Sequence, residues 1–197
     1  MSLTNITNIL GKPYFQAPNC LIYNMDCLEA IKLLPEKLVA LTVTSPPYNI
    51  GKEYEKLLLL DEYLNWCEQW IAEVYRVTLD RGAFWLNLGY LSIRDRAKAI
   101  PISYLLWDKV PFYMIPEVVW NYGAGVAGSK FFSPRNEKFL WYVKNQYKYT
   151  FNLDEGLFWS CGGKGSVSVS LREAFGPVPQ EVLFLLSPKT QESRLAC

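Results

Sequence analysis

A hydroxyl, two prolines and an aromatic ring follow one another in the segment Thr44-Ser45-Pro46-Pro47-Tyr48, directly after an apolar run at residues 39–43. Consecutive prolines fix φ and lack N–H groups, so they cannot continue a helix or a central strand. The Ser45 hydroxyl and the Pro46 carbonyl are hydrogen-bond acceptors. Two acceptors on a rigid loop could orient the exocyclic amine of a planar base and direct its lone pair at an electrophile. The Tyr48 ring could stack on the same base.

The same segment also suits an ordinary turn that ends a strand, so its composition alone leaves both interpretations open. The proposed amine chemistry needs no histidine and no metal, and the chain contains no histidine. The cysteines are odd in number and match no zinc-binding spacing, which predicts reduced thiols and no metal site. They are Cys20, Cys27, Cys67, Cys161 and Cys197.

The segment from Ser45 to Tyr48 resembles the catalytic motif of the β-class amino-group DNA methyltransferases of restriction–modification systems. In that family Asp, Asn, Ser or Thr precedes Pro-Pro and an aromatic residue. Further segments that resemble the family follow in the expected order, and together the resemblance covers roughly residues 20–153. They are residues 24–35, 82–89, 120–121 and 133–137.

The resemblance implies an α/β fold of the S-adenosylmethionine-dependent methyltransferase type, a Rossmann-like sheet with flanking helices. It implies methyl transfer from S-adenosylmethionine to the exocyclic amine of a base that is flipped out of duplex DNA. Serine at the first motif position, here Ser45, is typical of N4-cytosine enzymes, and aspartate is typical of N6-adenine enzymes. We therefore expect N4-cytosine methylation, with N6-adenine as the alternative. The expected catalytic residues are Ser45, Pro46, Pro47 and Tyr48.

For the methyl donor, the resemblance places Asp26 against the adenine of S-adenosylmethionine, with Cys27 and Thr44 as further donor contacts. Asp26 follows a predicted strand at residues 20–23 and precedes a predicted helix at residues 27–34. Its carboxylate would equally serve as the N-cap of that helix, and the two functions are compatible.

Basic and aromatic side chains interleave between residues 127 and 150 around a single acid, Glu137. Basic groups can contact phosphates while rings stack on unpaired bases. The alternative is an aromatic β-hairpin with a charged, solvated face. The net charge of +1 provides no global basic field, so DNA binding must rest on this local cluster. The expected DNA contacts are Asn49, Lys130, Arg135, Asn136 and Lys138.

Hydrophobic periodicity predicts the elements that position these residues. Strands are expected at residues 39–43, 83–88, 118–121 and 137–143, and a loop at residues 49–60 could close over a substrate. A helix capped by Asp61 and a second helix at residues 100–109 are also expected. No signal peptide or membrane span is expected, which favours a bacterial or archaeal cytoplasm.

We divide the chain into a lead-in (residues 1–19), a methyltransferase catalytic region (20–154) and a divergent tail (155–197). The tail could reflect truncation, a frameshift or true divergence. The family's glycine-rich donor motif, Asp-Pro-Phe-x-Gly-x-Gly, does not occur in the sequence. We therefore expect an incomplete sheet with an exposed apolar edge and weak donor binding by this chain alone.

Expected partners are duplex DNA, a second polypeptide that completes the donor site, or a cognate restriction endonuclease. A non-catalytic nucleic-acid-binding remnant and a methyltransferase for RNA or small amines remain alternatives.

Overall fold

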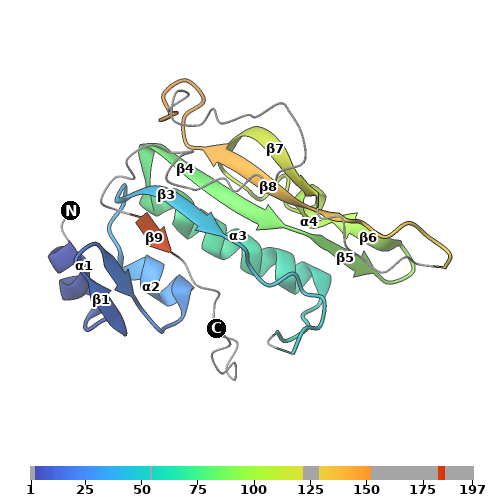
Figure 1. Cartoon of the computed structure of the whole chain (residues 1–197), viewed down its shortest axis with the longest axis horizontal. Helices are drawn as coiled ribbons and strands as arrows, with labels where there is room; N and C mark the ends of the chain where they lie inside the picture. The colour runs from blue at the N-terminus through green and yellow to red at the C-terminus, as the bar shows by residue number, and fades with distance from the viewer. Residues whose placement is uncertain (1–2, 54, 122–128, 152–181, 185–197) are drawn as a thin grey trace, which may run out of the picture.

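The computed structural model describes residues 3–53, 55–121, 129–151 and 182–184, and Figure 1 shows their arrangement. The helices are α1 (Leu3–Leu10), α2 (Cys27–Leu33), α3 (Leu60–Val77) and α4 (Ile102–Leu105). The strands are β1 (Phe15–Ala17), β2 (Cys20–Ile22), β3 (Val39–Thr44), β4 (Thr78–Leu88), β5 (Tyr90–Ile93), β6 (Ala97–Pro101), β7 (Tyr113–Asn121), β8 (Asn136–Val143) and β9 (Val182–Phe184).

The central sheet has the strand order β7-β8-β4-β3-β9. Strand β3 runs parallel to both β4 and β9, whereas β8 runs antiparallel to β4 and β7. The carboxyl ends of three parallel strands therefore meet at one edge of the sheet. In α/β sheets, this is the edge at which ligands bind. Ser45 begins the loop that leaves β3 at this edge.

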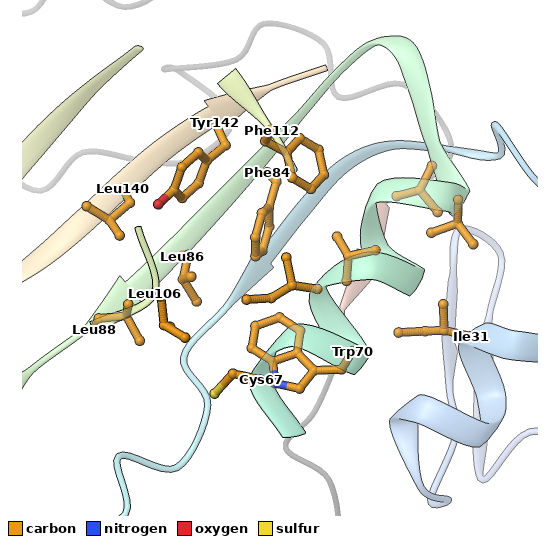
Figure 2. Close-up of a cluster of buried hydrophobic side chains, with 14 of the residues drawn as sticks. Ile31, Cys67, Trp70, Phe84, Leu86, Leu88, Leu106, Phe112, Leu140 and Tyr142 are labelled. Atoms are coloured by element: carbon orange, nitrogen blue, oxygen red, sulfur yellow. The ribbon is translucent and has the colours of Figure 1, made fainter. Parts of the chain in front are cut away.

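Helix α3 covers one face of the sheet (Figure 1) and supplies much of the core. Its buried side chains recur at helical spacing and pack against alternate residues of β4 and β8, as Figure 2 shows for Cys67 and Trp70 below Phe84 and Leu86. Each large side chain buried in this way contributes about 1.5–3 kcal/mol. The packing fixes the strand from which the catalytic loop emerges. The buried α3 residues are Tyr63, Cys67, Trp70, Ile71, Val74 and Val77.

The prediction of a helix at residues 100–109 is wrong over most of its length. Residues 97–101 form strand β6, in which Ile100 pairs with Leu91 of β5, and only Ile102–Leu105 is helical. Pro101 explains the change of structure, because proline tolerates the end of a strand and the start of a helix but not a helix interior.

The N-terminus of α3 also differs from the prediction. Leu59, rather than Asp61, occupies the N-cap position, and Asp61 lies in the first turn. The Glu62 carboxylate accepts a hydrogen bond from the Leu59 N–H over 3.2 Å. Acidic residues in a first turn complement the positive end of the helix dipole, which accounts for their presence here.

The strand predicted at residues 20–23 exists as β2, but it pairs with β1 in a separate hairpin and not with the central sheet. Pro18 and Asn19 form its two-residue turn between Ala17 and Cys20. The lead-in therefore contains a helix and a strand, and Asp26 does not follow a strand of the central sheet.

Strand β9 belongs to the region predicted as a divergent tail, and it pairs Val182–Phe184 with Leu41–Val43 of β3. On this side the described sheet therefore ends at β9 and not at β3. At the other end of the described sheet, β7 exposes Val118, Val119 and Trp120. The remainder of residues 152–197 lies outside the described residues. None of the described helices is long and apolar enough to span a membrane.

Candidate functional site

The Pro-Pro loop is anchored from below by helix α3. Tyr63, which is 2% exposed, donates a hydrogen bond from its hydroxyl to the Pro47 carbonyl over 2.8 Å. Burial raises the pKa of Tyr63 far above the usual phenol value, so this hydroxyl remains a donor at any physiological pH. Pro46 is buried, while Ser45 is exposed. The anchored loop therefore presents the serine hydroxyl to solvent at the sheet edge.

Four polar side chains, which we call the hydroxyl cluster, meet above the end of β4: Ser45, Tyr48, Asn87 and Glu137. The Ser45 and Tyr48 hydroxyls both donate to Asn87 Oδ1, over 3.1 and 2.8 Å. The two hydroxyl oxygens lie 3.1 Å apart, and the Tyr48 hydroxyl also lies 3.3 Å from Glu137 Oε2. With its hydrogen directed at Asn87, the Ser45 oxygen keeps its lone pairs for an incoming N–H donor.

Hydrogen bonds to both ends of the Asn87 amide fix its orientation in the hydroxyl cluster. The residue is 8% exposed, and its Nδ2 donates to the Lys138 carbonyl over 3.4 Å. A buried polar side chain must find partners, because an unsatisfied buried group costs about 1–3 kcal/mol. The amide nitrogen therefore faces β8 and the amide oxygen faces the two hydroxyls.

Gly89 makes room for the ring of Tyr48. A Cβ atom at position 89 would lie 2.7 Å from Tyr48 Cε2 and 2.9 Å from Cδ2, closer than such atoms approach. Beside the ring lies a cavity of about 350 Å³, lined among others by Tyr48, Tyr90, Lys98 and Glu137. Ligand pockets typically measure 300–1,000 Å³. The hydroxyl cluster therefore borders a space large enough for a small planar ligand.

The loop after Tyr48 is closed by its own hydrogen bonds. The Asn49 side chain donates to the Leu58 carbonyl over 3.0 Å and accepts from the Leu58 N–H over 2.8 Å. Glu55 accepts from the backbone N–H groups of Asn49, Ile50 and Lys52 over 2.8–2.9 Å. Asn49 has a φ of 58°, a left-handed conformation that asparagine tolerates. Its amide, predicted to contact DNA, is occupied within this loop.

Of the predicted donor contacts, Asp26 acts as the N-cap of α2. Its Oδ1 accepts from the backbone N–H groups of Leu28 and Glu29 over 2.9 and 3.1 Å. Both bonds use one oxygen, so Oδ2 retains acceptor capacity for a ligand. Burial, followed by the Asp26 charge, raises the pKa of the Cys27 thiol to about 11. Thr44 is half-buried at the end of β3, next to Ser45.

Within the described residues, no three or more His, Cys, Asp or Glu side chains are grouped so as to hold a metal ion.

Two of the predicted DNA contacts, Lys130 and Arg135, are exposed on the segment that precedes β8. Together with Phe131 and Phe132 they line a hollow of about 860 Å³. Phe132 is fully exposed, and Lys98 Nζ lies 5.5 Å from the centre of the Phe131 ring. This segment matches the expected combination of positive charge and exposed rings.

The other basic and polar candidates have partners inside the protein. Asn136 Oδ1 accepts from the Tyr90 hydroxyl over 2.8 Å. Lys138 Nζ lies 2.6 Å from Glu117 Oε1 with its side chain 15% exposed, and this hydrogen bond raises the pKa of Lys138. Lys144 Nζ donates to the Tyr75 and Thr78 carbonyls over 2.8 Å each, at the C-terminal end of α3.

Comparison with known proteins gives the family. Residues 39–157 match the family described as DNA methylase. Because this match spans more than half of the chain, the chain belongs to that family.

Two relatives and one solved structure illustrate the similarity. The chain is 59% identical over 152 residues to the type II methyltransferase M.ScaI of Streptomyces caespitosus, covering 77% of this chain and 50% of the relative. It is 31% identical over 137 residues to the DNA adenine methyltransferase YhdJ of Escherichia coli (strain K12), covering 68% of this chain and 44% of the relative. The chain thus spans about half the length of these curated relatives.

Among solved structures, the PvuII DNA methyltransferase (cytosine-N4-specific) matches with a TM-score of 0.62 and 18% identity, covering 94% of this chain and 63% of that chain. The predicted α/β methyltransferase fold and the resemblance to amino-group DNA methyltransferases are thereby confirmed.

Tyr63, Asn87 and Gly89 were not among the site residues predicted from the sequence. One signal was available for Asn87, because it is a polar residue within the otherwise apolar strand at residues 83–88. A polar residue in such a strand requires a buried partner. The roles of Tyr63 and Gly89 depend on contacts between distant segments, which no local pattern reveals.

Proposed function

We propose that this chain carries the catalytic half of an S-adenosylmethionine-dependent DNA methyltransferase that methylates the exocyclic N4 amine of cytosine in duplex DNA. The observation that carries the proposal is the orientation of the Ser45 hydroxyl. Its hydrogen is directed to Asn87 Oδ1, which leaves the oxygen lone pairs available, and the oxygen lies 3.1 Å from the hydroxyl of Tyr48, a residue that lines the cavity. Family membership and the fold shared with a cytosine-N4-specific enzyme support the same function.

The residues of the loop would act mainly by orientation. The target amine is paired in the duplex, so the base must first be flipped out. Ser45 Oγ and the Pro46 carbonyl would then accept its two N–H groups, while Tyr48 fixes the plane of the ring. Orientation of two reactants can contribute up to roughly 7–11 kcal/mol of barrier reduction.

S-adenosylmethionine supplies an electrophilic methyl group. The residues available for it are Thr44, at the carboxyl edge of the parallel strands, and Asp26, whose Oδ2 retains acceptor capacity. Both side chains carry oxygens that can accept hydrogen bonds from the hydroxyls and the adenine amine of a nucleoside. Cys27, adjacent to Asp26, would contribute a neutral thiol. A second polypeptide that contributes to donor binding is a further proposed partner.

Methylation of adenine N6 is the second candidate, and the similarity to a DNA adenine methyltransferase favours it. Adenine and cytosine both present an exocyclic amine, so the hydroxyl cluster suits either base. Serine at position 45 is the feature that favours cytosine.

Duplex DNA would bind chiefly through Lys130 and Arg135, whose exposed charges can contact phosphates. Asn49, Asn136 and Lys138 remain proposed contacts, and each would have to exchange or share an internal hydrogen bond. A cognate restriction endonuclease is a further proposed partner.

The test is incubation of the purified protein with isotopically labelled S-adenosylmethionine and mixed-sequence DNA, followed by digestion to nucleosides. The reaction is run with and without any polypeptide encoded beside it. Label in N4-methylcytosine is expected. Label in N6-methyladenine would establish the alternative. Label in RNA alone, when a parallel incubation offers RNA in place of DNA, would overturn both.

A further inference from the structure

We propose that Glu137 takes up the proton that the target amine must lose, through a relay of the Ser45 and Tyr48 hydroxyls. This inference rests on the proposed amine methylation. Glu137 lines the cavity beside Tyr48 and comes from β8, far in sequence from the Pro-Pro loop.

The chemistry requires a proton acceptor that the Pro-Pro loop does not contain. The amine nitrogen forms a bond to the methyl carbon while the carbon–sulfur bond breaks, with its electron pair going to sulfur. The nitrogen is left with a positive charge and must lose one proton. A carboxylate is a far stronger base than a neutral serine hydroxyl or asparagine amide, so it can take up that proton and then release it to water.

The geometry supplies a continuous path to such a carboxylate. The hydrogens that both hydroxyls direct at Asn87 Oδ1 would first turn towards the next oxygen of the path. Ser45 Oγ would then accept the proton from the amine and pass its own to Tyr48, whose oxygen lies 3.1 Å away. The Tyr48 hydroxyl would pass its own proton to Glu137 Oε2 over 3.3 Å. Each hydroxyl gains one proton and loses one, so only Glu137 changes its charge. Because Glu137 is half-buried and borders the cavity, it can later release the proton to water.

Asn87 keeps the relay assembled without taking part in it. Its Oδ1 accepts from both hydroxyls, which holds Ser45 and Tyr48 within reach of each other. An amide oxygen cannot carry the proton away, so the path ends at Glu137. Glu137 supplies the carboxylate of the hydroxyl cluster, and its Oε2 lies 3.3 Å from the Tyr48 hydroxyl.

Other charged and polar groups surround Glu137. Lys98 of β6 and Tyr90 of β5 line the same cavity. The Lys138–Glu117 ion pair joins β8 to β7 beside it. Glu117 is therefore a suitable control, because it is a carboxylate of the same sheet that pairs with Lys138.

The first arm of the test needs no methyl donor. Carbon-13 NMR of the glutamate carboxyls, with the Glu137 signal assigned by its loss in Glu137→Gln, reports on the contact of this group with Tyr48. Removal of the hydroxyl in Tyr48→Phe should change the carbon-13 chemical shift of the Glu137 carboxyl at neutral pH, because the carboxylate loses a hydrogen-bond donor. The Glu117 signal should not change. An unchanged Glu137 chemical shift would overturn the relay.

The second arm measures single-turnover methyl transfer against pH. Glu137→Gln should lower the rate by about 10²-fold or more and abolish the loss of rate at acidic pH, with DNA affinity unchanged. Glu117→Gln should retain the wild-type pH profile. A Glu137→Gln protein with the wild-type rate and profile would overturn the proposal and leave the proposed function intact. Absence of transfer by the wild-type protein would count against the proposed function, and the carbon-13 chemical shift of Glu137 would still decide the relay.

Discussion

The Tyr48 hydroxyl donates a hydrogen bond to Asn87 Oδ1 over 2.8 Å, although 39 residues separate them in the chain. The contact arises because β3 and β4 are parallel neighbours, so the loop that follows β3 lies beside the last residues of β4. One buried amide thereby sets the direction of two hydroxyls on the loop. The position of Ser45 therefore depends on β4 as much as on its own strand.

This dependence predicts different effects for two substitutions of Asn87. Asn87→Leu preserves the approximate size of the side chain but removes the common acceptor, so the Ser45 hydroxyl loses its fixed orientation. We expect methyl transfer to fall by about 10²-fold. Asn87→Asp keeps an acceptor oxygen and should retain most of the rate. Transfer kinetics and thermal unfolding of both variants would measure this, and equal losses of rate in the two variants would contradict the assigned role.

Gly89 should be required for the position of the Tyr48 ring. A Cβ at Gly89 would lie 2.7 Å from the ring, so Gly89→Ala should displace it and reduce transfer. Gly82 provides a matched control, since its Cβ would lie 2.7 Å from Thr78 Cγ2, in β4 itself. Gly82→Ala should lower the unfolding temperature without a specific loss of transfer in the protein that remains folded. Similar kinetics for the two variants would argue against a special contact at Gly89.

Tyr63→Phe should weaken the anchor of the Pro-Pro loop. Loss of its bond to the Pro47 carbonyl is expected to lower the free energy of unfolding by about 0.5–1.5 kcal/mol. Urea denaturation would measure this, and the transfer rate should fall as the loop loosens. Tyr142→Phe removes a hydroxyl from another buried tyrosine of the same core and should leave the transfer rate unchanged. An unaltered rate in Tyr63→Phe would show that the loop holds its shape without the anchor.

The basic residues should separate into two classes. Lys130→Gln and Arg135→Gln should each weaken DNA binding and reduce the dependence of affinity on salt by about one unit of slope. Lys144→Gln should instead lower stability, because its ammonium bonds to the Tyr75 and Thr78 carbonyls. Binding isotherms at several salt concentrations, with thermal unfolding in parallel, would distinguish the classes. A loss of DNA affinity in Lys144→Gln with normal stability would contradict this division.

The sequence predicted the parts of this molecule that depend on local pattern. Periodicity and residue type predict the strand before Ser45 and the strands that include residues 118–121 and 137–143. They also predict that Asp26 caps α2. The helix predicted at residues 100–109 failed because Ile100 pairs with Leu91, a contact that outweighs a short helical pattern. Strand β9 was missed because three apolar residues become a strand only beside β3.

The candidate site likewise combines residues that a local pattern predicts with residues that only contacts between distant segments reveal. The Pro-Pro loop was visible because its residues are consecutive, whereas Asn87 and Glu137 join it from two other strands. Likewise, charge alone could not distinguish exposed Lys130 from Lys138, which is paired with Glu117. Contacts with distant segments of the chain therefore determine which residues join the site and which lysines are paired.

The central claim is that Ser45 orients the target amine for attack and does not merely shape the loop. The most direct measurement compares Ser45→Ala with the wild-type protein in both methyl transfer and DNA affinity. We expect the transfer rate of Ser45→Ala to fall by about 10²-fold or more, with its DNA affinity within about twofold of wild type. Equal losses in transfer and affinity, or an undiminished transfer rate, would contradict it.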